Sequence, residues 1–209
     1  MGYIQRVKLI AALNKIVSSE NPVVLYHGSY DPDLKEIKDD GLFGGIFAGS
    51  LSTARSHGDH IYKIELDWTD VCENRDLAGH TDLVRQVFER ETELDKNDED
   101  YEHDFNLLWE IIINDKGTND SLWVCGHADY PLKSEDSYDA RKEADNIIGY
   151  LFNERDLGDA GWKAQKIRGI IAKKLGYKAV ECSDEHGISY LILPGIEIEP
   201  YSGDDDDDD

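Results

Sequence analysis

A histidine and a glycine that follow an apolar run are the first residues in the chain whose types and spacing suggest chemistry. The run, Val-Val-Leu-Tyr at 23–26, has β-branched and aromatic side chains and predicts a buried strand. His27 stands at the strand end, and Gly28 lets the backbone turn or approach a ligand closely. A strand that delivers an imidazole and a glycine backbone to a sheet edge can build a binding site. This segment alone favours the alternative, an ordinary hydrogen-bonded histidine.

A second polar group, His57, Asp59 and His60, has side chains that could bind a metal ion. It lacks the helical HExxH spacing, and no further ligand cluster accompanies it. We therefore favour a turn fixed by hydrogen bonds of Asp59 and His60 over a zinc site, and we expect no metal.

A third polar group, Asp184 and Glu185 followed by Gly187, separates two apolar runs near the end of the chain. Carboxylates and glycine in such a position are typical of a turn. On their own, these residues predict a turn and no chemistry.

The glycine-rich segment 41–49 is a candidate ligand loop. It has neither the GK[ST] ending of a P-loop nor the GxGxxG spacing of a dinucleotide-binding turn. Its aromatic residues, Phe43 and Phe47, are core residues by default. A surface on which a planar ring stacks is the alternative.

Helices and strands must position these groups, and the hydrophobic pattern predicts both, which indicates an α+β protein. The last predicted helix, 161–175, has two lysines in its last turn and is followed by Gly176, a natural cap. The remaining predicted elements are helices at 4–17 and 52–56 and strands at 23–26, 61–67, 177–182 and 189–193.

The stretch from about 69 to 159 differs in character from the rest. It predicts helices at 81–93, 103–114 and 138–153, separated by polar loops such as the acidic run 95–100, which we interpret as solvated. We expect one domain over 1–203 with this stretch as a helical acidic insertion. The oligo-Asp tail 204–209 should be disordered, because it has no apolar surface to bury and repels itself.

The formal net charge is −23, and the six aspartates at the end account for only six of these charges. Such acidity disfavours direct binding of nucleic acid and of anionic membranes, and it favours docking onto basic partners. The apolar part of the first helix, 8–13, is too short for a signal peptide or a membrane span. The three cysteines, Cys72, Cys125 and Cys182, form no CxxC pair. Together these features predict a cytoplasmic protein.

The order of these pieces resembles the ADP-ribosyltransferase superfamily, and in particular the small anti-CRISPR ADP-ribosyltransferases that act on the type I-F surveillance complex. The resemblance covers about half of the chain. It rests on the His27 strand end, 41–44 with 47–48, 58–60 before the 62–64 strand, Trp162 leading into 175–177, and 184–187 followed by Tyr190.

The resemblance implies a split β-sheet that binds NAD+ as a substrate between two small sheets. By analogy, His27 would hydrogen-bond a ribose, and the backbone of Gly28, with Ser29 next to it, would meet the nicotinamide carboxamide. Phe47 or Tyr62 would stack on the nicotinamide ring or wall it in. Asp184 would be the catalytic acid with Glu185 as its neighbour, and only one of the two should face the cleft, since adjacent residues of an extended chain point to opposite sides.

The chain departs from two branches of the superfamily. It has no arginine on the first strand, unlike the arginine-modifying toxins, and no match for the usual glutamate of the His-Tyr-Glu class. These departures argue against poly-ADP-ribose synthesis. They leave mono-transfer or plain NAD+ hydrolysis.

The leading hypothesis is a mono-ADP-ribosyltransferase of a phage or mobile element that modifies a host protein and so inhibits a CRISPR-Cas complex in the host cytosol. The target would be a basic, nucleic-acid-binding protein, with no direct contact to nucleic acid. The rival hypothesis is a non-catalytic acidic protein that mimics DNA and occludes a basic site. The charge disfavours a third possibility, a toxin acting on host RNA or DNA.

Overall fold

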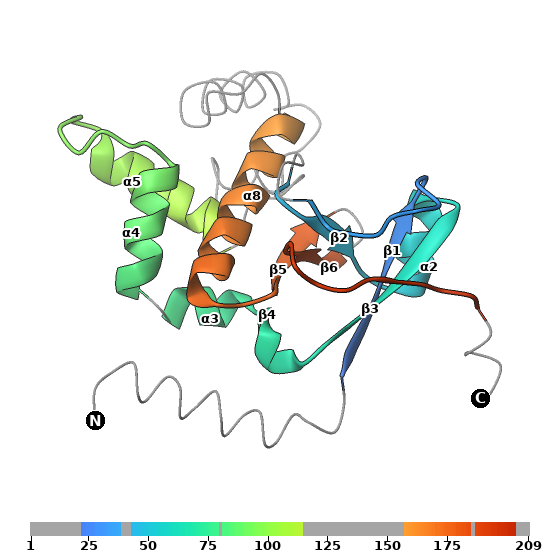
Figure 1. Cartoon of the computed structure of the whole chain (residues 1–209). Coiled ribbons are helices and arrows are strands. Elements are labelled where there is room, and N and C mark those ends of the chain that lie inside the picture. The colour runs from blue at the N-terminus through green and yellow to red at the C-terminus, as the bar shows by residue number, and fades with distance from the viewer. Residues whose placement is uncertain (1–21, 39–42, 80, 115–156, 185–186, 204–209) are drawn as a thin grey trace, which may run out of the picture.

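The strands in the described part of this protein form two separate sheets. The structure, a computed structural model, describes residues 22–38, 43–79, 81–114, 157–184 and 187–203 (Figure 1). In chain order the strands are β1 (Val23–Ser29), β2 (Ile46–Ala48), β3 (His60–Leu66), β4 (Val71–Cys72), β5 (Ala179–Asp184), β6 (Gly187–Ile192) and β7 (Glu199–Pro200).

The two sheets meet edge to edge. The three-stranded sheet has the order β1-β3-β7 and the four-stranded sheet the order β2-β6-β5-β4. Neighbours are antiparallel except β4 and β5, which are parallel. Where β1 passes the end of β2, Tyr26 and Gly49 exchange two backbone hydrogen bonds of 2.9 Å. The fold is α+β, as the hydrophobic pattern predicted, with the split sheet that the family resemblance implied.

Helices cover both sheets. α2 packs on β1, whereas α8 packs on β5 and also contacts α4 and α5. In Figure 1, α3, α4 and α5 (green) gather beyond α8, away from the three-stranded sheet. The helices are α2 (Leu51–His57), η1 (Trp68–Asp70, a 3-10 turn), α3 (Asn74–Gly79), α4 (Thr81–Glu91), α5 (Tyr101–Ile112) and α8 (Leu157–Leu175).

The alternation of side chains along the four-stranded sheet divides the interior into two cores. Val180 and Leu191 face the helices and join a core with residues of α3, α4, α5 and α8. Ala179 and Ile192 face the other way and join a core with β1 and β3. The second core fills the space between the two sheets, so the inner face of β1 points toward the four-stranded sheet.

Three short strands were not predicted, and one of them, β7, pairs with β3. β2 lies within the glycine-rich segment and pairs with β6, and β4 lies in the stretch interpreted as a helical insertion and pairs with β5. With two or three residues each, these strands have too few side chains for a sequence pattern. Their pairing partners are far away in the chain, so tertiary contacts determine them.

The ends of other elements also differ from the prediction. Asp184 and Gly187, both expected in a turn, belong to strands, because β5 continues to Asp184 and β6 begins at Gly187. α8 begins at Leu157, four residues before the predicted start.

The predicted cap of α8 is confirmed. Gly176 has φ of 94°, and the bonds Gly176 N–H to Lys173 O and Tyr177 N–H to Ala172 O close a Schellman motif. The helices predicted at 4–17 and 138–153, residues 41–42 and the oligo-Asp tail lie outside the described residues. Within the described ranges, no helix is both long and apolar enough to cross a membrane.

Candidate active site

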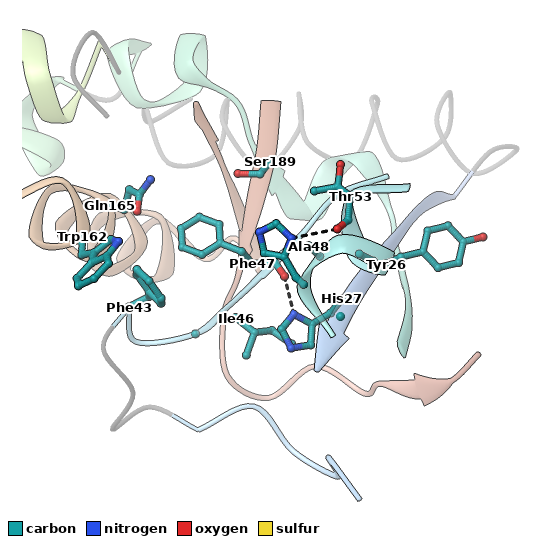
Figure 2. A pocket seen from close by; sticks show the side chains of 15 residues that line it. Tyr26, His27, Phe43, Ile46, Phe47, Ala48, Thr53, Trp162, Gln165 and Ser189 are labelled. Carbon is teal, nitrogen blue, oxygen red and sulfur yellow. Dashed lines mark hydrogen bonds between the residues drawn. The ribbon is translucent and has the colours of Figure 1, made fainter. Parts of the chain in front are cut away.

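A cleft of about 570 Å³ lies where the two sheets meet. It is lined by residues of β1, the segment around β2, α2, α8 and β6, so five parts of the chain converge on it (Figure 2). The lining residues are Tyr26, His27, Gly28, Phe43, Gly45, Ile46, Phe47, Ala48, Gly49, Thr53, Ala54, His57, Trp162, Gln165 and Ser189. His27, Gly28 and Phe47, all predicted from the sequence as site residues, are among them.

His27 lines the cleft with one ring nitrogen already in use. It follows Val23 and Leu25 in the alternation of β1, so it lies where the inter-sheet core gives way to the cleft. Its Nδ1 lies 2.7 Å from the carbonyl oxygen of Phe47 (Figure 2). Because a carbonyl oxygen can only accept a hydrogen bond, Nδ1 is the donor. Nε2 is therefore the nitrogen that can meet a ligand, and it accepts when the ring is neutral.

The surroundings of the His27 ring favour its neutral form. Burial lowers the pKa of His27 below 6.5, the Phe47 carbonyl partly opposes this shift, and nearby His57 adds to it. At neutral pH, His27 thus offers a hydrogen-bond acceptor to a ligand, suited to a hydroxyl group.

Gly28 is a glycine because α2 packs directly on β1. A Cβ at this position would lie 1.9 Å from the carbonyl oxygen of Ala54, which no side chain tolerates. Tyr26 turns its backbone N–H and C=O toward Gly49, away from β3. The alternation of an antiparallel ladder turns the N–H and C=O of Gly28 the same way, toward the open edge of β1. One donor and one acceptor are therefore presented side by side at the cleft.

Aromatic rings form the α8 end of the cleft. Phe43 makes edge-to-face contacts with Phe47, at 4.9 Å between ring centroids, and with Trp162, at 5.9 Å. Gln165, three residues after Trp162 on the same face of α8, lies beside them. The sequence had left open whether Phe43 and Phe47 are core or ligand-facing, and both line the cleft.

Ser29 and Tyr62, both expected at the NAD+ site, make hydrogen bonds within the protein and lie outside the described cleft lining. Ser29 Oγ accepts a hydrogen bond from Asp31 N–H at the end of β1. Tyr62, 2% exposed, donates its hydroxyl to Asp31 O and accepts from Leu34 N–H. Neither lines the cleft among the described residues, so Phe47 is the better candidate for the wall of a ring site.

Asp184 lies at the end of β5, where its backbone pairs with Gly187. It stands two residues past Cys182, and the cross-strand partner of Cys182 is the cleft residue Ser189. Glu185 lies outside the described residues. The catalytic role of either carboxylate thus stays a prediction, and the register brings the backbone of Asp184 near the cleft.

Several cleft residues were not singled out from the sequence as site residues: Thr53, His57 as a ligand-facing group, Gln165 and Ser189. His57 Nδ1 donates to the carbonyl of Thr53, and Ser189 Oγ donates to that of Cys182, at 3.4 Å. Of these four residues, Gln165 has a recognisable sequence signal as a ligand-facing residue, because it is a polar residue within the apolar stripe of the last helix.

The described lining contains no lysine, arginine, aspartate or glutamate. In a chain with a formal net charge of −23, a cleft wall free of carboxylates stands out. Such a wall avoids the repulsion that the rest of the surface would exert on an anionic ligand.

The comparison with protein families decides the class of this protein. The family model described as "Anti-CRISPR Type I-F ADP-ribosyltransferase AcrIF11" matches residues 23–124 and 133–200, which is more than half of the chain. The chain belongs to this family. Its members are anti-CRISPR ADP-ribosyltransferases, so the resemblance inferred from the sequence is confirmed.

A solved structure supports the assignment to the AcrIF11 family. It is described as the "Crystal structure of an anti-CRISPR protein" and is 26% identical in sequence. The alignment covers 87% of this chain and 97% of that chain, with a TM-score of 0.52. None of the curated proteins matches.

Proposed function

We propose that this protein is a mono-ADP-ribosyltransferase that uses NAD+ to modify a protein component of a CRISPR-Cas complex and thereby inhibits it. The observation that carries the proposal is the pairing, in one cleft between split sheets, of a neutral His27 with the exposed backbone edge of Gly28. A protein that only mimicked DNA would need neither group.

The residues of the cleft fit NAD+. A primary carboxamide offers one acceptor and one donor side by side, which complement the N–H and C=O of Gly28. Phe47 walls the space beside them, and His27 Nε2 accepts from a ribose hydroxyl. The cleft volume of about 570 Å³ lies in the range of roughly 300–1,000 Å³ that small-molecule sites occupy.

The reaction needs one carboxylate beside the ribose. As the bond between C1′ and the nicotinamide nitrogen breaks, nicotinamide leaves with the bonding electrons and positive charge builds on the sugar, as in glycoside cleavage. We propose that Asp184 stabilises this charge. A nucleophile of the target then bonds to C1′ and loses its proton to solvent or to a nearby base.

The target we propose is a basic, nucleic-acid-binding subunit of the complex. The net charge of −23 supports this choice, because opposite charges steer association and increase its rate. The same charge disfavours nucleic acid itself as the substrate.

The test is incubation of the purified protein with labelled NAD+ and a lysate of cells that contain the complex. We expect label on protein and release of nicotinamide. Asp184→Asn should reduce both at least about 100-fold, since losing charge stabilisation at a reacting centre costs this much. Asp98→Asn, a matched change at an exposed loop carboxylate, should have no effect.

Each other outcome has a defined meaning. Release of nicotinamide without labelled protein would make the protein an NAD+ hydrolase. If wild type neither labels protein nor releases nicotinamide, the enzymatic proposal is wrong.

The second candidate, an acidic protein that occludes a basic site by mimicking DNA, is favoured by the net charge alone. It requires inhibition that weakens with salt and is unaffected by Asp184→Asn or His27→Ala. Inhibition that depends on NAD+ would exclude it.

A further inference from the structure

Gln165 is a buried polar side chain whose position is unexplained by the fold. It lies on the inner face of α8 next to Ala164 and is 5% exposed. In the described part of the chain its amide makes no hydrogen bond, although it lines the cleft (Figure 2). Because this amide faces the cleft, a ligand bound there would replace water at its C=O and NH₂ groups.

Aromatic rings stand beside this amide. Trp162 is 39% exposed and packs edge-to-face against Phe43. A side-chain amide next to exposed aromatic surface is the combination with which proteins recognise a nucleobase, because the amide pairs with the edge of the base and the rings cover its faces. The α8 end of the cleft therefore has the chemistry of a base site.

NAD+ has two planar groups, and the cleft has two different ends. At the β1 end, the backbone of Gly28 complements a carboxamide, as proposed above. At the α8 end, the amide of Gln165 has a C=O and an NH₂ in the arrangement that pairs with the N6 amine and N7 of adenine.

We infer that Gln165 recognises the adenine of NAD+, with Trp162 and Phe43 as the walls of the adenine site. This inference rests on the proposed function, because it assigns the second half of the same substrate. It makes Gln165 a specificity-determining residue with no part in bond breaking.

Hypoxanthine is the diagnostic base. It carries a carbonyl oxygen where adenine carries the N6 amine, so the C=O of Gln165 would face a second acceptor and one of the two hydrogen bonds would be lost. A site built around a hydrogen bond rejects an analogue that cannot form it.

The experiment compares NAD+ with nicotinamide hypoxanthine dinucleotide by the rate of nicotinamide release. Wild type should prefer NAD+ in kcat/KM by on the order of 10- to 100-fold. Gln165→Met keeps the length of the side chain. It should bring the ratio of the two kcat/KM values close to one, because it lowers kcat/KM for NAD+. Gln86→Met, the same change at an exposed position of α4, should keep the wild-type ratio. The ratio is measured within each variant, so a partly unfolded sample does not change it.

Calorimetric binding of ADP and of inosine diphosphate gives a second readout that needs no catalysis. We expect wild type and Gln86→Met to prefer ADP, and Gln165→Met to bind both ligands equally. An unchanged preference in Gln165→Met would overturn the inference while leaving the enzymatic proposal intact. A wild type that prefers ADP but releases no nicotinamide would support the adenine site and contradict the enzymatic proposal. Binding of neither ligand by wild type would overturn the inference as well.

Discussion

The two ring nitrogens of His27 have different surroundings. Nδ1 is held by the carbonyl of Phe47, which fixes the ring and its tautomer, and Nε2 is left as an acceptor for a ligand. Because Phe47 itself walls the cleft, its backbone and side chain act together: one orients the imidazole and the other bounds the space beside it.

The lowered pKa of His27 has a consequence for stability. As the pH falls through 6.5, the unfolded chain takes up a proton at this residue before the folded protein does, so folding loses stability. We expect His27→Gln, which still can donate to Phe47 but does not titrate, to remove this contribution. Urea unfolding at about pH 7.5 and about pH 5.5 measures it. Wild type should lose more free energy of unfolding between these values than the variant; equal losses would contradict the lowered pKa.

Individual site residues differ in how well the sequence predicts them. His27 and Gly28 could be placed at a strand end, because an apolar run followed by a polar residue and glycine is a local signal. Tyr62 had the right position, directly across from His27 on β3, but its hydroxyl bonds to the 31–34 loop instead of facing the cleft. Gln165 was missed because a helical stripe is recognised by its apolar members, and a single polar residue within it is taken as a break in the pattern.

At the scale of elements, the close packing of α2 on β1 depends on two glycines. A Cβ on Gly28 would lie 1.9 Å from Ala54 O, and one on Gly58 would lie 2.3 Å from Ser29 N. The helix can approach the strand this closely only without side chains at both points. This contact brings Thr53 and His57 of α2 to the cleft.

Gly28→Ala should therefore destabilise the protein by at least about 1–3 kcal/mol, the usual cost of overpacking. Gly79→Ala is the control, because a Cβ there has no neighbour within 4 Å. The free energy of unfolding in urea is the measurement. If both variants unfold at the wild-type concentration of urea, α2 does not pack on β1 as described.

A buried arginine connects α8 to the helical part of the protein. The guanidinium of Arg168 donates to the carbonyls of Ile112 and Ile113 at the end of α5, to the Oδ1 of Asn74 and to the carbonyl of Glu181 on β5. It thus joins α5 and α3 to the strand that ends at Asp184.

We expect Arg168→Met to reduce the free energy of unfolding by about 3 kcal/mol or more, since it leaves several buried acceptors without a donor. Arg75→Met, at an exposed arginine paired with Glu73, should cost less than about 1 kcal/mol. Chemical denaturation measures the free energy of unfolding of both variants. Similar small losses would mean that the helices are held by apolar packing alone.

The elements themselves were predicted best where they are long and amphipathic. α8 and its cap at Gly176 follow from helical spacing and a terminal glycine, and β1, β3, β5 and β6 follow from apolar runs. β2, β4 and β7 could not be predicted, because their few residues become strands only by pairing with β6, β5 and β3. The division of the strands into two sheets came from the family resemblance, since the hydrophobic pattern does not specify which strands pair.

At the scale of the whole molecule, the acidity and the cleft wall have separate tasks. The charge of −23 would act at long range on the basic partner proposed above, whereas the described cleft wall contains no lysine, arginine, aspartate or glutamate.

Salt should separate these two tasks. Raising the ionic strength from about 0.05 M to about 0.5 M shortens the range of the electrostatic attraction several-fold. We expect transfer to the target to slow by 10-fold or more, whereas nicotinamide release in the absence of target should change little. Initial rates of both reactions at matched NAD+ concentrations provide the measurement. Equal salt dependence would argue against electrostatic steering to the target.

The central claim is that this protein inhibits a CRISPR-Cas complex by attaching ADP-ribose to it. The most direct measurement is the intact mass of each subunit of a purified type I-F complex after incubation with the protein and NAD+. We expect one subunit to gain the mass of one ADP-ribose and the complex to lose DNA binding. Both effects should be absent without NAD+ and with Asp184→Asn. Loss of DNA binding with no change in mass, equally strong for Asp184→Asn, would contradict the account.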